Sequence, residues 1–138
     1  MREILFRGKT IVTGRWIEGL LWKKKYDSNK IFISYFPDKD DNEDALVVDP
    51  ETVGQFTGMT DKNGKEIFEG DVVAFTRVNA LGWNTHRVGE VRYYDELPIF
   101  YIMASTGDAW DWVDCENIEV IGNIFDNPEL MEGDDSNG

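Results

Sequence analysis

Hydrophobic and polar side chains alternate with a period of two along much of the chain, in short runs rich in aromatic and β-branched residues. Two such runs, residues 16–22 and 30–36, are separated by the triplet Asp-Ser-Asn at residues 27–29. Because this alternation is typical of strands and the triplet favours a turn, the segment predicts a β-hairpin.

The first half continues with a polar stretch over residues 37–44 and a short apolar run over residues 45–48. The apolar run predicts a strand. Asp49 and Pro50 follow it, and an aspartate N-cap with a proline in the first turn predicts a single helical turn over residues 49–52.

The second half predicts four more strands, and then one capped helical turn at residues 127–131. These strands cover residues 72–75, 87–94, 99–103 and 118–121, the middle two forming a hairpin across residues 95–98. No long amphipathic helix is predicted. We therefore expect a mainly β fold, with an N-terminal β-meander packed on a small, partly open barrel.

Composition and charge narrow the class of protein. The length of 138 residues fits one domain, and 41% hydrophobic residues can fill a core, which excludes a disordered polyanion. A formal net charge of −13 disfavours general nucleic-acid binding. The charge is uneven: residues 1–36 carry +5, residues 37–71 carry −8, residues 72–107 carry 0 and residues 108–138 carry −10. Such blocks are either solvated faces or a means of steering head-to-tail self-association.

Cys115 is the single cysteine, so the fold does not depend on an intramolecular disulfide. Charged residues at the start of the chain interrupt the apolar stretch that a signal peptide needs. The longest uncharged apolar-rich run, residues 97–107, is about half as long as a membrane span. We therefore expect a cytoplasmic protein with no membrane partner.

Four segments carry a family resemblance: REILFRGK at residues 2–9, PETVGQFTGMTDKNGKEIFEGDVV at residues 50–73, GEV at residues 89–91 and EVIGNIFDNPEL at residues 119–130. Through them the chain resembles the YopX-like proteins, small proteins of phages and prophages. The resemblance implies a mainly β fold with an SH3-like barrel in the second half, a viral or prophage origin, residence in the host cytoplasm and homo-oligomeric assembly. It brings no established activity and no functional residues.

Pattern and resemblance together predict one YopX-like domain over residues 1–132. Within it we expect a β-meander subdomain at residues 1–58 and an SH3-like barrel subdomain at residues 59–126. Residues 133–138 are acidic and polar and are expected to form a mobile tail.

Two glycine turns stand out in the central block. Gly64 follows Asn63 and is expected in a left-handed turn, with Asp61 accepting hydrogen bonds from amides of the turn. Gly70 is expected to let the chain bend into the next strand, with Asp71 holding the bend. Both motifs are interpreted as determinants of the fold, with ligand binding as the alternative.

Motifs for nucleotide loops, nucleophile elbows and Cys or His metal pairs are missing from the sequence. His86 and Cys115 are the one thiol–imidazole combination. Nothing around Cys115 supports catalysis, so we expect a small buried thiol and an ordinary polar histidine. The sequence gives no catalytic residue, no cofactor and no metal ligand, and predicts that the protein is not an enzyme.

Two acidic clusters are candidate calcium sites. Residues 38–44 with Asp49 imitate the start of a calcium loop, but Glu43 stands where that loop needs glycine, so a solvated loop is preferred. The second cluster surrounds two tryptophans. If it is a strand, the tryptophans share one face and Asp111 lies on the other, so the carboxylates do not all converge. Its members are Asp108, Asp111, Asp114 and Glu116, around Trp110 and Trp112.

The one hint of nucleic-acid binding is a group of aromatic and basic residues: Trp16, Trp22, Tyr26 and Lys23–Lys25. Single-strand binders combine such groups as stacking platforms. The preferred interpretation is a meander whose aromatics pack on the barrel and whose lysines protect an exposed edge.

Three functional classes remain at this stage. The first is a non-enzymatic phage accessory protein that contacts either itself or a host or phage protein. The second is an acidic decoy that presents carboxylates in place of DNA phosphates to a host protein, using residues 108–138. The third is a metal-dependent or thiol enzyme, and weak single-strand nucleic-acid binding is a further alternative to the first.

Overall fold

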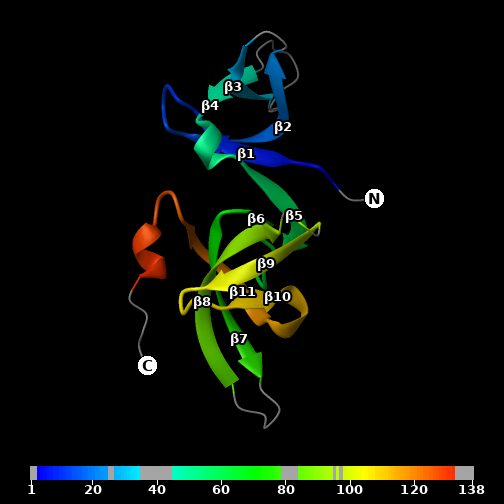
Figure 1. Cartoon of the computed structure of the whole chain (residues 1–138), viewed down its shortest axis with the longest axis vertical. Helices are drawn as coiled ribbons and strands as arrows, with labels where there is room; N and C mark the ends of the chain where they lie inside the picture. The colour runs from blue at the N-terminus through cyan, green and yellow to red at the C-terminus, as the bar shows by residue number, and fades with distance from the viewer. Residues whose placement is uncertain are drawn as a thin grey trace. The chain divides into compact units, whose positions relative to one another are not determined.

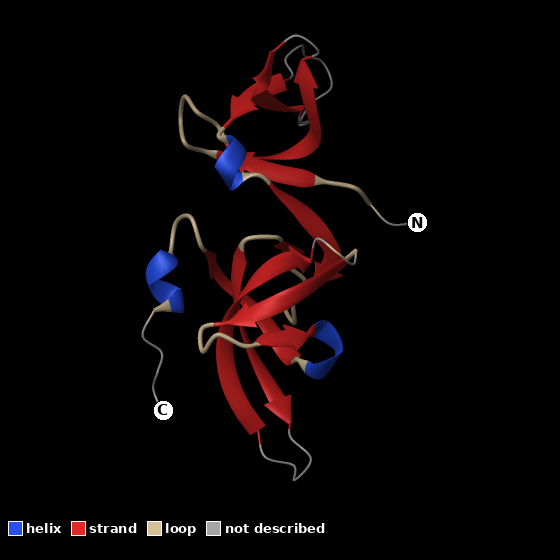
Figure 2. Cartoon of the chain, viewed as in Figure 1, coloured by secondary structure: helices blue, strands red, loops and turns tan. Residues whose placement is uncertain are grey.

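The computed structural model describes residues 3–24, 27–34, 45–78, 84–94, 96 and 98–132. Across these ranges it has eleven strands, three single 3-10 turns and no α-helix (Figure 1, Figure 2). The mainly β prediction is confirmed, and the turns number one more than the two expected. The strands are β1 (Phe6–Lys9), β2 (Trp16–Lys24), β3 (Asp27–Ser34), β4 (Ala45–Val48), β5 (Gly54–Thr60), β6 (Glu66–Phe68), β7 (Asp71–Val78), β8 (Asn84–Tyr94), β9 (Ile99–Ala104), β10 (Ala109–Asp111) and β11 (Glu116–Asn123). The turns are η1 (Pro50–Thr52), η2 (Trp112–Asp114) and η3 (Pro128–Met131).

The strands form two antiparallel sheets, in the orders β4-β3-β2-β1-β5-β6 and β10-β9-β8-β7-β11. The chain divides into two compact units, Met1–Gly58 and Met59–Gly138, and β5 crosses the boundary between them. No segment of the described chain forms a helix of the length and apolarity needed to cross a membrane.

The first unit has a hydrophobic core of its own. Its core is formed by Ile17, Ile33 and Val48, one from each of β2, β3 and β4. The sheet curls enough for Thr10, just after β1, to bridge Val48 of β4, and the Ile11 amide donates to the Val47 carbonyl at 3.1 Å. The predicted strands over residues 16–22 and 45–48 are confirmed.

The predicted turn at residues 27–29 is wrong. These residues belong to β3, which pairs with β2 down to Lys24 opposite Asp27. The ladder shifts its register between Lys23 and Lys24, and this irregularity allows pairing to continue past the expected turn. Strand pairing therefore overrides the local preference of Asp, Ser and Asn for turns.

The second unit contains the predicted hairpin, because Tyr94 pairs with Ile99 and the ladder continues to Gly89 opposite Ala104. One face of its sheet is the core, formed by Ile67, Val73, Phe75, Val91, Ile102, Ala104 and Cys115. In the described residues, no ladder joins the edge strands β10 and β11, so the sheet is not a closed barrel.

The helical turns differ in how they are capped. At η1 the Asp49 Oδ1 atom accepts from the Glu51 amide at 3.1 Å, which confirms the predicted cap. At η3 the Asn127 side chain makes no cap hydrogen bond; its Oδ1 accepts from the Asn123 amide at 3.2 Å instead. The predicted side-chain cap is therefore wrong, since Asn127 is used to hold the end of β11.

Both glycine turns of the central block have the expected geometry. Gly64 has φ of 84° and Gly70 has φ of 93°, values in the left-handed region that favours glycine. Asp71 is almost fully buried, and its Oδ2 accepts from the Phe68 amide at 2.8 Å across the bend.

The polar stretch at 37–44 and the predicted tail at 133–138 lie outside the described residues.

Candidate functional site

Asp61 ties the DKNG turn to the last strand of the second unit. Its Oδ1 accepts from the amides of Asn63 at 2.8 Å and Lys65 at 2.9 Å, as the sequence predicts. Its Oδ2 accepts from the Val120 amide at 2.9 Å, 59 residues away, and nothing local in the sequence indicates this bond. Burial raises the pKa of Asp61, but the three amide hydrogen bonds outweigh it and hold the pKa below its ordinary value.

Other residues of the family segments also shape the backbone. A Cβ on Gly89 would stand 2.5 Å from Cγ2 of Ile102 and 2.8 Å from the Met103 carbonyl oxygen, so only glycine fits this close strand contact. The Ile124 amide donates to the Gly70 carbonyl at 2.9 Å. These roles support the interpretation of the motifs as determinants of the fold.

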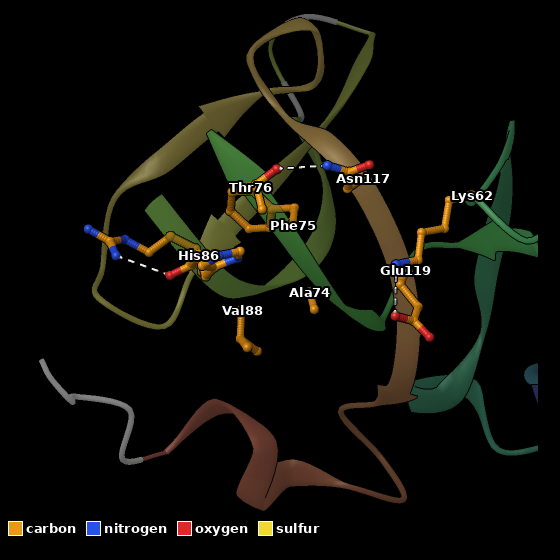
Figure 3. Close-up of a pocket in the computed structure, with 9 residues that line it drawn as sticks. Lys62, Ala74, Phe75, Thr76, His86, Val88, Asn117 and Glu119 are labelled. Carbon is orange, nitrogen blue, oxygen red and sulfur yellow. Dashed lines mark hydrogen bonds and ion pairs between the residues drawn. The ribbon is translucent and has the colours of Figure 1, made fainter. Parts of the chain in front are cut away.

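A groove of about 430 Å³ opens on the face of the second unit's sheet opposite its core (Figure 3). The side chains of Ala74 and Thr76 on β7 and of Val88 on β8 line its floor, and His86 is exposed beside them. Lys62 Nζ lies 3.5 Å from Glu119 Oε1 on one wall. The groove thus offers one ion pair, one imidazole and the Thr76 hydroxyl, with no thiol among its lining residues.

Asn117 lines the same groove with a left-handed backbone, at φ of 55°. Its Nδ2 donates to Thr76 Oγ1 at 3.3 Å, and that hydroxyl donates to the Glu116 carbonyl at 3.2 Å. Asn117 sits where the ladder between β11 and β7 shifts its register, between Glu116 and Glu119. Since asparagine tolerates this conformation and a bulge requires it, the geometry is explained by the strand irregularity.

His86 and Cys115 lie on opposite faces of the sheet. His86 is exposed on the groove face, opposite Thr76, whereas Cys115 is buried in the core beside Phe75. Burial raises the pKa of the Cys115 thiol to about 11, with Asp114 adding to the rise. A protonated, buried thiol turned away from the imidazole is a poor nucleophile.

The acidic clusters do not form a metal site in the described part of the chain, where no three His, Cys, Asp or Glu side chains converge. The possible loop at 38–44 falls outside that part. In the second cluster β10 ends at Asp111 and Trp112 begins η2, so the cluster is not one continuous strand. Trp110 and Trp112 nevertheless both pack against the core, and the carboxylates of Asp108, Asp111, Asp114 and Glu116 are exposed.

The aromatic and basic group of the first unit makes contacts within its own chain. The Arg7 guanidinium lies 4.7 Å from the centre of the Trp16 ring, and Lys9 Nζ lies 5.7 Å from it. Trp22 stacks on Phe32 with ring centres 4.5 Å apart. One face of each tryptophan is thereby covered, which reduces the surface left for stacking on bases. Lys25 and Tyr26 lie outside the described residues.

An aromatic surface that sequence reasoning missed lies at the end of the β8–β9 hairpin. Tyr93, Tyr94 and Ile99 are 38%, 41% and 44% exposed. Tyr93 makes an edge contact with Phe100 at 5.0 Å, and Tyr94 makes one with Tyr101 at 6.2 Å. The signal was present in the sequence, since two consecutive tyrosines break the alternation and place aromatics on both faces of one hairpin.

These observations define an antiparallel β protein of two compact units. The chain belongs to the YopX family, because the family model described as YopX protein matches residues 5–132. It is also similar to the crystal structure of protein EF1440 from Enterococcus faecalis, at 24% sequence identity and a TM-score of 0.57. That similarity covers 96% of this chain and 100% of the other, and it shows a shared fold. No curated protein matches the chain.

Proposed function

We propose that this chain is a non-enzymatic phage or prophage accessory protein of the host cytoplasm that acts through protein contacts, chiefly with a second copy of itself. Its five-stranded sheet is best described as an SH3-like, partly open barrel that carries the contact surface. The observation that carries the proposal is the aromatic end of the β8–β9 hairpin, formed by Tyr93, Tyr94, Ile99, Phe100 and Tyr101.

The chemistry of this hairpin end is that of a protein interface. Aromatic residues are enriched at interfaces because they bury a large area while losing few rotamers. Three of the five side chains are more than a third exposed, and the two edge contacts between rings fix their orientation. Beside them, Arg92 is held by Glu90 through Nε and NH2, each 3.0 Å from Oε1. Register places Tyr94, Ile99 and Tyr101 on the same face of the hairpin as Arg92, and Tyr93 and Phe100 on the other face. The face with Arg92 combines rigid aromatic side chains with a fixed charge, which suits a specific contact.

The charge distribution favours a second copy of the chain as the partner that binds the hairpin end. Residues 1–36 carry +5 and residues 108–138 carry −10, so two copies arranged head to tail bring opposite charges together. Such an arrangement also relieves the repulsion that a net charge of −13 imposes on side-by-side association. Self-association of this kind weakens as salt screens the charges.

The test is the mass of the purified chain in solution, measured by light scattering at low and high salt. We expect a mass above the 15.9 kDa of one chain at low salt. The double variant Tyr94→Ser with Ile99→Ser should return it to the monomer with unchanged thermal unfolding. Val113→Ser is the matched control, because Val113 is 88% exposed in the same unit but lies on η2. A hairpin variant that associates as the wild type does would contradict the proposal.

A second candidate, the acidic decoy, is supported by the exposed carboxylates of Asp108, Asp111, Asp114 and Glu116, grouped within nine residues. A decoy of this kind should displace DNA from a basic host protein. Replacing the four with Asn and Gln should abolish that displacement while leaving the mass in solution unchanged. Failure of the wild type to displace DNA or to inhibit any host nuclease removes this candidate, and salt-dependent retention of single-stranded DNA would instead favour a weak single-strand binder.

A further inference from the structure

A second exposed apolar surface lies on the sheet of the first unit. Leu20 and Trp22 are 50% and 37% exposed. They are two positions apart on β2, so their side chains lie on one face of the strand. Ile17, which is in the core, and Leu21, which packs against the core, occupy the alternate positions of β2. The Leu20–Trp22 face is therefore turned away from the core of its unit.

Two contacts fix the orientation of the Trp22 side chain. Its Nε1 atom donates to Ser34 Oγ at 2.9 Å, and one face of its ring stacks on Phe32 with centres 4.5 Å apart and planes 13° apart. The indole N–H is thus already paired, and the part of the ring that stays exposed is apolar. Large aromatic side chains that are ordered before binding are typical anchors of protein interfaces, because little entropy is lost when they are covered.

Charge makes this face complementary to the aromatic end of the β8–β9 hairpin. Residues 20–30 contain four lysines and one aspartate and carry +3, whereas residues 90–99 contain three acidic residues and one arginine and carry −2. The arginine, Arg92, is paired with Glu90 at 3.0 Å. Glu96 is exposed, with its Oε1 atom 3.5 Å from the Tyr94 hydroxyl, so negative charge lies directly beside the aromatic side chains.

We propose that the hairpin end of one copy docks on the Leu20–Trp22 face of a second copy. This inference rests on the proposed function and names the surface that the hairpin end binds. Two hairpin ends repel each other through their like charges, and so do two Leu20–Trp22 faces, whereas the unlike surfaces attract. Each contact therefore joins two different surfaces, with Tyr94 and Ile99 of one chain against Leu20 and Trp22 of the other.

The first experiment changes the Leu20–Trp22 face and measures the mass of the chain by light scattering over a range of concentrations at low salt. Leu20→Glu places a carboxylate opposite the acidic hairpin end and keeps the stack of Trp22 on Phe32. We expect its dissociation constant for self-association to rise at least about tenfold. Val12→Glu is the matched control, because it adds the same charge at a 90% exposed apolar residue of the turn between β1 and β2, and it should associate as the wild type does.

Trp22→Ala is a second variant of this face and should weaken association by a similar factor. It removes the stack on Phe32, so its thermal unfolding is measured beside its mass. The Leu20→Glu result decides the question if Trp22→Ala does not fold, since Leu20 is half exposed and its replacement leaves the core of the unit intact.

The second experiment mixes two defective chains. The variant with Tyr94→Ser and Ile99→Ser lacks the hairpin anchors but keeps the Leu20–Trp22 face, whereas Leu20→Glu keeps the hairpin. Each alone should have a mass close to that of one chain, and an equal mixture should approach the mass of two, because one intact surface of each kind is present. A contact between two hairpin ends predicts no recovery in the mixture.

The outcomes separate this inference from the proposed function. A wild type that stays a single chain at every concentration overturns both. A wild type that associates, together with Leu20→Glu that associates equally well or a mixture that does not recover, overturns only the docking on the Leu20–Trp22 face.

Discussion

Replacing Asp61 by alanine removes the acceptor of three backbone amides at once. The Val120 amide belongs to a strand, and leaving a buried donor of this kind unpaired costs about 1–3 kcal/mol. Asn63 and Lys65 are exposed residues, so water can replace the carboxylate at their amides at about 0.5–1 kcal/mol each. We therefore expect Asp61→Ala to lower the free energy of unfolding by about 3–4 kcal/mol.

Urea unfolding followed by tryptophan fluorescence measures this loss. Amide hydrogen exchange gives a second, local measurement, because the Val120 amide should exchange faster in the variant. Asp114→Ala is the control, since this exposed aspartate should change stability by no more than about 0.5 kcal/mol. A loss below about 1 kcal/mol in Asp61→Ala, with Val120 exchange unchanged, would refute the claim that Asp61 joins the turn to β11.

Asp61 also makes the free energy of unfolding depend on pH, and the direction of this dependence follows from its pKa. The pKa of Asp61 is lower in the folded chain than its ordinary value of 3.8. Its stabilisation is therefore complete above about pH 4–5 and is lost as the pH falls through the folded pKa. Asp61→Asn should lose less stability than the wild type between pH 5 and about pH 3. Parallel curves for the two proteins would contradict the lowered pKa.

Three further predictions concern glycine positions and the thiol. Gly89→Ala should lower the unfolding free energy by about 2–3 kcal/mol or prevent folding, because the added Cβ overlaps Ile102 and the Met103 carbonyl, and chemical denaturation checks this. Gly64→Val and Gly70→Val should each lose at least about 1–2 kcal/mol through their left-handed backbones, and wild-type melting temperatures in both would disprove the turn interpretation. Cys115 should react with iodoacetamide far more slowly at pH 8 than after unfolding in urea, since its pKa is about 11, and equal rates would contradict its burial.

Local patterns in the sequence predicted the elements that local chemistry determines. Seven of the eleven described strands, the Asp49 cap and the Gly64 and Gly70 turns were predictable because each depends on residues within a few positions of one another. The strands β1, β5, β6 and β10 were not predicted. The turn predicted at residues 27–29 is wrong because a register shift in the ladder between β2 and β3 decides their conformation. The side-chain cap predicted at Asn127 is wrong for a similar reason, since its Oδ1 accepts from the Asn123 amide instead.

The surfaces were harder to predict than the strands. The bond from Val120 to Asp61 and the contact of Arg77 with Trp110 join residues 59 and 33 positions apart, and no local pattern indicates either of them. The Tyr93-Tyr94 pair is visible in the sequence as a break in the alternation of apolar and polar residues. Only the structure indicates an exposed surface there, because it shows that Ile99, opposite Tyr94, is exposed.

Sedimentation velocity of the wild type over a wide concentration range at low salt tests the central claim most directly. Association through the β8–β9 hairpin predicts a sedimentation coefficient that rises with concentration, and that falls to the value of a 15.9 kDa chain in the variant with Tyr94→Ser and Ile99→Ser. A wild type that sediments as a single 15.9 kDa chain at every concentration would contradict it.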